Sequence, residues 1–346
     1  MSQSRREMNR REFIKKGAQL AAGAAVVSTG MANASVPKGK QIPLPDGIPN
    51  RVFGKTGVKL PVLGFGGAAV VRVWGSRLSF EDNAKLIRHA YDRGVRYFDT
   101  SRNYMESEPI IGAGLKGIRD NVFLATKVDT TNPRKVRKEV EISLKALQTD
   151  YLDLLQIHGT PGIEQMNFRQ AMKIHEEVVK LKDEGIVRFV GLTGHHYFDK
   201  LYALISTGGF DQCMLAYGYF RKGMVRILDN RMLELREMCL AKAHELGMAI
   251  VSMKVLGGSG GAVLGHMAGR IVPNFNANEI GRIPGAAIRW VLNDPRIHML
   301  CVGMATPADI DQNIETVSGQ TALTNQDRML LAAFSSKAYQ HPNYRG

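Results

Sequence analysis

Residues 122–158 have the sequence VFLATKVDTTNPRKVRKEVEISLKALQTDYLDLLQIH, in which two short apolar segments flank a longer amphipathic one. Val122–Lys127 and Leu152–His158 have the length and apolar character of buried strands. Pro133–Leu147, between them, has apolar residues at the i, i+3, i+4 spacing of a helix. A strand, a helix and a strand in this order predict two parallel strands that are joined by a right-handed crossover.

The same alternation of short apolar and longer amphipathic segments continues over most of the chain. Six more apolar segments are predicted as strands: Val62–Gly67, Val95–Thr100, Val187–Thr193, Gln212–Tyr217, Met248–Lys254 and His298–Gly303. Further helices are predicted over Asn83–Arg93, Phe168–Glu184, Asp229–Leu246 and Ile283–Leu292. Eight strand–helix units predict an α/β fold, a closed (β/α)8 TIM barrel rather than an open sheet. Arg51–Lys59, with a Lys-Thr-Gly turn between extended arms, predicts an N-terminal β-hairpin across the barrel floor.

The composition is that of an ordinary globular protein and selects no function by itself. Hydrophobic residues make up 44% and charged residues 23% of the 346 residues. The formal charge is +14, but the cations are interleaved with acidic residues, so we expect no nucleic-acid partner. The three cysteines, Cys213, Cys239 and Cys301, form no CxxC or Cys/His pattern, so no metal site is predicted.

The first 34 residues differ in character from the rest of the chain. Asn9–Lys15 (NRREFIK) resembles a twin-arginine export motif, Gly17–Thr29 is weakly apolar, and Ala32–Ala34 offers a signal-peptidase site. We therefore predict a twin-arginine (Tat) signal peptide over 1–34, a linker over 35–50 and the barrel over 51–346. The Tat export machinery is then a partner and the protein is periplasmic or otherwise exported; a helix that belongs to the fold is the alternative. No later segment has about 18 consecutive apolar residues, so we expect no transmembrane helix in the mature chain.

Polar residues stand at the ends of four predicted strands that face the active site in such a barrel. These strand-end residues, which are expected to meet at the mouth, are Asp99, Lys127, His158 and Thr193. Tyr104 follows in the loop after Asp99. Reduction of a carbonyl needs a proton donor at the oxygen, and a tyrosine near an ammonium qualifies. Lys127 would lower the pKa of Tyr104, Asp99 would hold Lys127, and His158 would bind the substrate oxygen. A structural ion pair and a core histidine are the alternatives.

These residues occur in segments that resemble the aldo-keto reductase family. The segments are YFDTSRNY over 97–104, ATK over 125–127, LLQIHG over 154–159, GKTG over 54–57, LGFG over 63–66 and VGM over 302–304. The resemblance implies an NAD(P)(H)-dependent oxidoreductase that interconverts an aldehyde or ketone and an alcohol. In that function Tyr104 is the general acid/base, assisted by Lys127, Asp99 and His158. The alternative is a non-catalytic nicotinamide-binding barrel that acts as a regulatory or sensor subunit.

The same resemblance implies that NADP or NAD lies extended over the barrel mouth. The residues that it places at the cofactor are Gly66, Thr193, Gly194, Met214, Met253, Leu256, Gly257, Gly303, Thr306, Asp309, Gln312 and Asn313. Three of them depart from common family choices: Gly194 replaces an asparagine, Met253 an aromatic ring, and Asp309 stands near the place of an arginine. A carboxylate repels the 2′-phosphate of NADPH and accepts from a free 2′-hydroxyl. Asp309 therefore favours NADH or a relaxed preference, against the NADPH that is usual in the family.

The sequence defines the substrate only as a small-molecule carbonyl or alcohol. Trp74, Tyr219 and Phe220 are candidate walls of its pocket, and packing explains each of them equally well. His195 and His196 follow the fifth predicted strand and are interpreted as substrate-loop residues rather than metal ligands. A sugar isomerase or a glycosidase would need a metal or paired carboxylates at the strand ends, which this chain does not offer.

Overall fold

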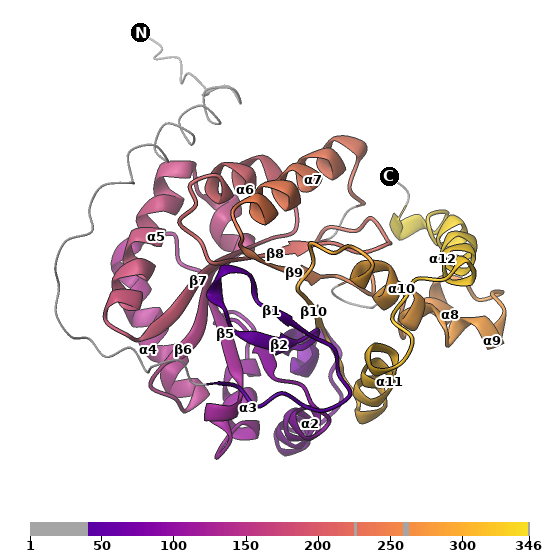
Figure 1. The fold of residues 1–346 in the computed structure, drawn as a ribbon, viewed down its shortest axis with the longest axis horizontal. Helices are drawn as coiled ribbons and strands as arrows, with labels where there is room; N and C mark the ends of the chain where they lie inside the picture. The colour runs from indigo at the N-terminus through magenta and orange to yellow at the C-terminus, as the bar shows by residue number, and fades with distance from the viewer. Residues whose placement is uncertain (1–40, 225–226, 259–262, 345–346) are drawn as a thin grey trace, which may run out of the picture.

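The computed structural model describes residues 41–224, 227–258 and 263–344, so the predicted signal peptide and the start of the predicted linker lie outside it. Within these residues, eight parallel strands follow one another in chain order and close into a barrel (Figure 1). They are β3 (Leu63–Gly66), β4 (Tyr97–Asp99), β5 (Phe123–Val128), β6 (Leu152–Ile157), β7 (Val187–Gly194), β8 (Gln212–Ala216), β9 (Ala249–Met253) and β10 (Met299–Val302). The predicted (β/α)8 TIM barrel is confirmed.

Helices surround the barrel on its outside (Figure 1). They are α2 (Phe80–Asp92), α3 (Ser107–Gly114), α4 (Val136–Leu147), α5 (Phe168–Asp183), α6 (Phe198–Ile205), α7 (Asn230–Glu245), α8 (Ala268–Ile271), α9 (Ala277–Ile280), α10 (Ile283–Leu292), α11 (Pro307–Ser318) and α12 (Asn325–Ala338). The five predicted helices are among them, and α5 begins where Asn167 and Gln170 form a reciprocal capping box. Over the described stretches, no helix is long and apolar enough to cross a membrane.

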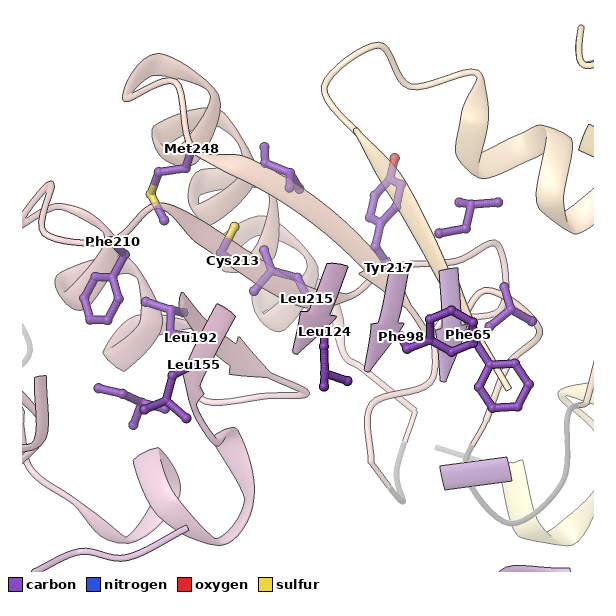
Figure 2. Close-up of a cluster of buried hydrophobic side chains, with 14 of the residues drawn as sticks. Phe65, Phe98, Leu124, Leu155, Leu192, Phe210, Cys213, Leu215, Tyr217 and Met248 are labelled. Atoms are coloured by element: carbon purple, nitrogen blue, oxygen red, sulfur yellow. The ribbon is translucent and has the colours of Figure 1, made fainter. Parts of the chain in front are cut away.

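Successive residues of the barrel strands point to opposite sides of the sheet. Phe98, Leu124 and Leu155 pack in the cluster between the barrel and its helices, part of which Figure 2 shows. Tyr97 and Phe123, which precede two of them in the chain, pack in a separate cluster inside the barrel. Alternate residues of each strand therefore form two cores. The outer core packs against the helices, and the inner core fills the barrel below its mouth.

The N-terminal hairpin closes one end of the barrel, as predicted. Its strands β1 (Asn50–Val52) and β2 (Lys59–Pro61) are antiparallel and lie across the barrel end in Figure 1. Phe53, between them, is 1% exposed, and its ring lies 5.9 Å from that of Tyr97 and 5.3 Å from that of Phe123. This aromatic plug leaves the other end, at which the strands finish, as the mouth.

The last residues of the predicted linker pack on the barrel. Ile42 belongs to the interior cluster and Ile48 to the outer one. The carbonyl of Pro43 accepts a hydrogen bond from Arg96 Nε at 2.8 Å. Residues 41–49 therefore contribute to the fold, which their polar, proline-rich composition did not indicate.

Candidate active site

The mouth of the barrel brings the four predicted catalytic residues together. Asp99 is the last residue of β4, Lys127 lies in β5, and His158 directly follows β6. Tyr104 comes from the loop after β4, and Lys127 Nζ lies 4.8 Å from the centroid of its ring. The rings of Tyr104 and His158 meet edge to face, with centroids 5.7 Å apart. Residues of β4 and β5, the residue after β6 and the loop after β4 thus bring a carboxylate, an ammonium, an imidazole and a phenol together at the mouth.

Lys127 and Asp99 form a buried ion pair in which each partner has a further hydrogen bond. Lys127 Nζ donates to Asp99 Oδ1 at 2.5 Å and to the carbonyl of Thr100 at 2.7 Å. The other carboxylate oxygen of Asp99 accepts from Gln156 Nε2 at 2.7 Å. Burial acts to lower the pKa of Lys127, but Asp99 and then Tyr104 act in the opposite direction and the pKa is raised. The ammonium form is therefore favoured, and its bonds to Asp99 and Thr100 hold it beside Tyr104.

Tyr104 keeps its proton at neutral pH. Burial raises its pKa to about 12, although the ammonium of Lys127 acts to lower it. Lys127 thus acts on the phenol in the predicted direction, but burial outweighs this effect and the pKa of Tyr104 lies above its usual value. The phenol stands ready as a proton donor, and the indole of Trp74 packs edge-on against it at a centroid distance of 5.2 Å.

His158 is held by a carboxylate that the sequence analysis did not single out. Its Nδ1 bonds to Asp129 Oδ1, and Ser101 Oγ lies 3.2 Å from the same nitrogen. Ser101 Oγ also lies 3.3 Å from the second oxygen of Asp129. Burial lowers the pKa of His158, and the bond to Asp129 acts in the opposite direction. His158 is thus a buried imidazole whose Nδ1 is hydrogen-bonded to Asp129 and Ser101.

Three residues of the site were missed: Ser101, Asp129 and Gln156. Each lies two positions from a residue that was predicted, namely Asp99, Lys127 and His158 respectively. Residues two apart on a strand point to the same side. Extending the predicted strand-end positions by one such step would have found all three.

A model of the aldo/keto reductase family matches residues 62–328 of the chain. The chain belongs to this family. L-galactose dehydrogenase of Arabidopsis thaliana is 27% identical over 293 residues, which cover 78% of this chain and 88% of the relative. D-arabinose 1-dehydrogenase of Saccharomyces cerevisiae is 28% identical over 192 residues, which cover 49% of this chain and 55% of the relative. Membership places the chain among oxidoreductases that act on carbonyl or alcohol groups.

Solved aldo-keto reductases share the barrel. The holo form of a Bacillus halodurans enzyme superposes with a TM-score of 0.63 at 20% identity, covering 83% of this chain and 96% of that chain. A Klebsiella pneumoniae aldo-keto reductase in complex with NADPH gives a TM-score of 0.60 at 18% identity, covering 83% of this chain and 94% of that chain. At these identities the likeness concerns the fold.

The end of β7 explains why Gly194 replaces the asparagine that is common in aldo-keto reductases. A Cβ atom on Gly194 would lie 1.9 Å from Cδ1 of Leu201 in α6. The preceding Thr193 is 1% exposed, and its Oγ1 accepts from the backbone N–H of Gly159 at 2.8 Å. The space for an asparagine side chain is therefore filled by α6, and the hydroxyl beside it helps to hold the loop after β6.

The two methionines predicted to contact the cofactor differ in their surroundings. Met214 in β8 is 2% exposed and packs in the cluster inside the barrel. Met253, the last residue of β9, is half-buried against the same cluster. Packing accounts for Met214, whereas Met253 presents surface at the mouth, where a ring can lie on its thioether.

Glycines let the backbone approach closely on the β9–β10 side of the mouth. A Cβ on Gly66 of β3 would lie 3.2 Å from the backbone nitrogen of Gly303, which follows β10. Gly257 has a φ of 80°, a conformation that side chains disfavour. Leu256 and Gly257, which the resemblance places at the cofactor, come shortly before residues 259–262, which lie outside the described residues.

The last four residues that the resemblance places at the cofactor lie in the first turns of α11 and at its N-cap: Thr306, Asp309, Gln312 and Asn313. The hydroxyl of Thr306 accepts from the N–H of Asp309 at 3.1 Å, and Asp309 Oδ2 accepts from the N–H groups of Ala305 and Thr306. Gln312 is exposed and donates to the carbonyl of Gly281 at 3.1 Å, while Asn313 is 4% exposed. Asp309 thus caps its own helix with one oxygen, and its contact with a ribose stays a prediction.

Lys254 is a further charged residue at the mouth. It directly follows Met253 and has a φ of 65°, which is rare for a residue other than glycine. Burial, and then the charge of Lys222, lower its pKa to about 7.

The three predicted wall residues do not lie together. Trp74 contacts Tyr104, as described above, and is 44% exposed. Tyr219 packs edge-on against Trp290, and Phe220 is 1% exposed and stacks on Tyr339 at 4.4 Å. Trp74 therefore lies beside Tyr104 at the mouth and stays a predicted wall residue, whereas Phe220 belongs to the core beside α12.

The adjacent histidines after β7 also have separate surroundings. His196 Nε2 lies 3.1 Å from Glu164 Oε1 in the loop after β6. His195 is buried, and burial followed by the charge of Lys254 lowers its pKa well below the usual range. Among the described residues, no group of His, Cys, Asp and Glu side chains is arranged to hold a metal ion.

Proposed function

We propose that this protein is an NAD(P)(H)-dependent oxidoreductase that interconverts an aldehyde or ketone and an alcohol. The observation that carries the proposal is the group at the mouth, in which the buried Asp99–Lys127 pair lies beside Tyr104 and His158. A buried ion pair costs desolvation energy and is weak evidence for stability. The pair is explained by its position beside Tyr104, because the ammonium of Lys127 would stabilise negative charge on the phenolic oxygen during proton transfer.

Each side chain has a defined task in this proposal. The nicotinamide, when bound, supplies the hydride for reduction or accepts it in oxidation. Tyr104 gives a proton to the substrate oxygen in one direction and takes it back in the other. Lys127 stabilises charge on the phenolic oxygen, Asp99 holds Lys127, and His158 fixes the position of the reacting oxygen.

The test is cofactor absorbance with a panel of aldehydes, ketones and sugars. Sugars belong on the panel because two relatives are named dehydrogenases of L-galactose and D-arabinose. Tyr104→Phe is expected to lower kcat by about 100- to 10,000-fold, as loss of a general acid does. Tyr151→Phe, whose hydroxyl lies 3.4 Å from Asp120 in an exposed position, is the matched control and should act like wild type.

Equal turnover by wild type and Tyr104→Phe would contradict the assignment of Tyr104. If no substrate is turned over while the protein binds nicotinamide nucleotides, the alternative of a regulatory or sensor barrel remains. The comparisons give that alternative no support, because the relatives named above are dehydrogenases.

For the cofactor we propose NADH or a relaxed preference. The support is Asp309 at the start of α11, whose carboxylate would repel a 2′-phosphate bound there. Fluorescence titration of the purified protein with NADH and NADPH measures the two Kd values. A Kd for NADH equal to or below that for NADPH is expected, and a much lower Kd for NADPH contradicts the proposal.

We further propose that residues 1–34 direct Tat export to the periplasm. The support is the order of the NRREFIK motif, an apolar stretch and the Ala32–Ala34 site. Replacing both Arg10 and Arg11 by Lys should keep the protein in the cytoplasm, as cell fractionation would show. Unchanged fractionation would contradict the proposal.

A further inference from the structure

The loop between β4 and α3 carries Tyr104 and has its own backbone hydrogen bonds. The N–H of Tyr104 donates to the carbonyl of Ser101 at 3.0 Å. The carbonyl of Tyr104 accepts from the N–H of Ser107, the first residue of α3, at 2.8 Å. These bonds shape the turn, but the position of the phenol over Lys127 also requires that the loop be joined to β5.

Glu108 of α3 makes this connection, and its side chain is 0% exposed. One of its oxygens, Oε2, accepts from the guanidinium of Arg102, two residues before Tyr104. The other oxygen, Oε1, accepts from the hydroxyl of Thr126 at 2.8 Å, and Thr126 directly precedes Lys127 in β5. One buried carboxylate therefore joins the loop that carries the phenol to the strand that carries the ammonium.

Neutral groups hold the first residues of the loop from the other side. The hydroxyl oxygens of Thr100 and Ser107 lie 2.8 Å apart, and Ser107 Oγ donates to the carbonyl of Gly67 at 2.8 Å. The packing here is close, since a Cβ on Gly67 would lie 2.6 Å from the carbonyl oxygen of Asp99. The start of the loop is thus fixed without an ion pair, and the residues that follow depend on the bond to the buried carboxylate.

The ion pair between Arg102 and Glu108 is unequal in its exposure to solvent. The side chain of Arg102 is 32% exposed, whereas that of Glu108 is completely buried. A buried ion pair is weak evidence for stability, because the cost of desolvation offsets the attraction between the charges. What such a pair does provide is direction, since the planar guanidinium binds a carboxylate in a defined orientation.

We propose that Arg102 and Glu108 are positioning residues for Tyr104. Their ion pair, with the bond to Thr126, fixes the phenol ring over Lys127 Nζ, which lies 4.8 Å from the ring centroid. This inference rests on the proposed oxidoreductase function. Both residues act through Tyr104 and take no part in the proton transfer itself. A displacement of about 1 Å at a reacting group lowers a rate about 100-fold, so slight freedom of this loop has a large effect.

The first readout is the steady-state kinetics of Glu108→Gln, in which the side chain keeps its size and loses its charge. We expect kcat to fall about 10- to 100-fold with little change in KM, since the substrate still binds while its proton donor is displaced. Arg102→Lys keeps a positive charge and should retain more activity than Arg102→Gln, which keeps none.

Asp153→Asn is the matched control for Glu108→Gln. Asp153 is 1% exposed, and its carboxylate accepts from Arg119, Arg188 and the N–H of Leu124. It lies near the start of β6, at the opposite end of the barrel from the mouth. This variant also neutralises a buried carboxylate that is bonded to arginine, but its kcat should equal that of the wild type.

The second readout shows whether Glu108 acts through Tyr104. In the background of Tyr104→Phe, Glu108→Gln should lower kcat no further, because the proton donor that it positions is already gone. If Glu108 had a merely structural role, the substitution would lower kcat by the same factor in both backgrounds.

The third readout needs no turnover. The chain has two tryptophans, so Trp290→Phe leaves Trp74 as the only indole, and Trp74 packs edge-on against Tyr104 at 5.2 Å. Glu108→Gln in this background should raise the quenching of Trp74 fluorescence by acrylamide, because the phenol beside the indole is held less firmly. Asp153→Asn should leave the quenching unchanged.

Glu108→Gln with the kcat and the Trp74 quenching of the wild type contradicts the positioning role and leaves the proposed function intact. An equal fall of kcat in the wild-type and Tyr104→Phe backgrounds contradicts it as well. If Glu108→Gln does not fold, Arg102→Gln takes its place in all three readouts with the same expectations. A wild-type protein that turns over no carbonyl or alcohol contradicts the proposed function, and the positioning role with it.

Discussion

The two halves of the barrel mouth are built on different principles. On the side of β4, β5 and β6, charged side chains are buried and each is bonded to a partner, as Lys127 is to Asp99 and His158 to Asp129. On the side of β7, β9 and β10, the mouth is shaped by glycines and backbone, as at Gly194 and Gly303. The departures from common family choices that we identified all lie on the second side. The first side therefore depends on paired charges, whereas the second depends on how closely backbone and neighbouring side chains approach each other.

The first side should be the more fragile one. Lys127→Met leaves Asp99 charged, buried and without its counter-ion, so we expect a loss of about 3–5 kcal/mol in the free energy of unfolding. Chemical denaturation of the purified variants measures this loss. Activity should disappear as well, because the charge beside Tyr104 is gone.

The control for this variant is Lys180→Met, at an exposed position where Nζ lies 2.6 Å from Glu177 Oε1. Exposed ion pairs contribute little, so its stability should match that of the wild type. Adding Asp99→Leu to Lys127→Met should restore part of the stability and none of the activity. If Lys127→Met were as stable as Lys180→Met, the difference between the two sides of the mouth would not exist.

On the side of β7, β9 and β10, stability should depend on the size of the side chains rather than on their charge. Gly194→Asn restores the residue that is common in the family but places its Cβ against Leu201. We expect a loss of about 1–3 kcal/mol from overpacking, measured by the same denaturation. Gly281→Asn is the matched control, because a Cβ at Gly281 meets nothing within 4 Å.

A double variant shows whether Leu201 is the cause. In the background of Leu201→Ala, the substitution Gly194→Asn should cost clearly less than in the wild type, since the two sites share one space. An equal cost in both backgrounds would mean that the strain lies elsewhere.

The sequence predicted the barrel because its strands are buried on both sides and appear as short apolar runs. It did not indicate α3, whose sequence SEPIIGAG is rich in glycine and contains a proline. This helix depends on close packing, since a Cβ on Gly112 would lie 2.7 Å from the carbonyl oxygen of Ala146 in α4. Contacts of this kind are set by the fold and leave no periodic pattern in the chain.

The meeting of Asp99, Tyr104, Lys127 and His158 at the mouth was predicted because their order along the chain matches the order of the strands. Asp129 was missed since it lies one residue beyond β5 and is absent from the resembling segments. The lowering effect of Lys127 on the pKa of Tyr104 was predicted, but the larger opposing effect of burial was not. The sequence shows which charged residues are present, but the extent to which each is removed from solvent depends on the packed structure.

The central claim is that the β4–β6 side of the mouth carries out hydride and proton transfer at a carbonyl group. The most direct test uses reduced cofactor deuterated at the hydride-bearing carbon, with mass spectrometry of the alcohol product. The wild type should place one deuterium on the former carbonyl carbon, and Tyr104→Phe should do so far more slowly. Wild-type protein that binds the cofactor but transfers no deuterium to any carbonyl on the panel would contradict the claim.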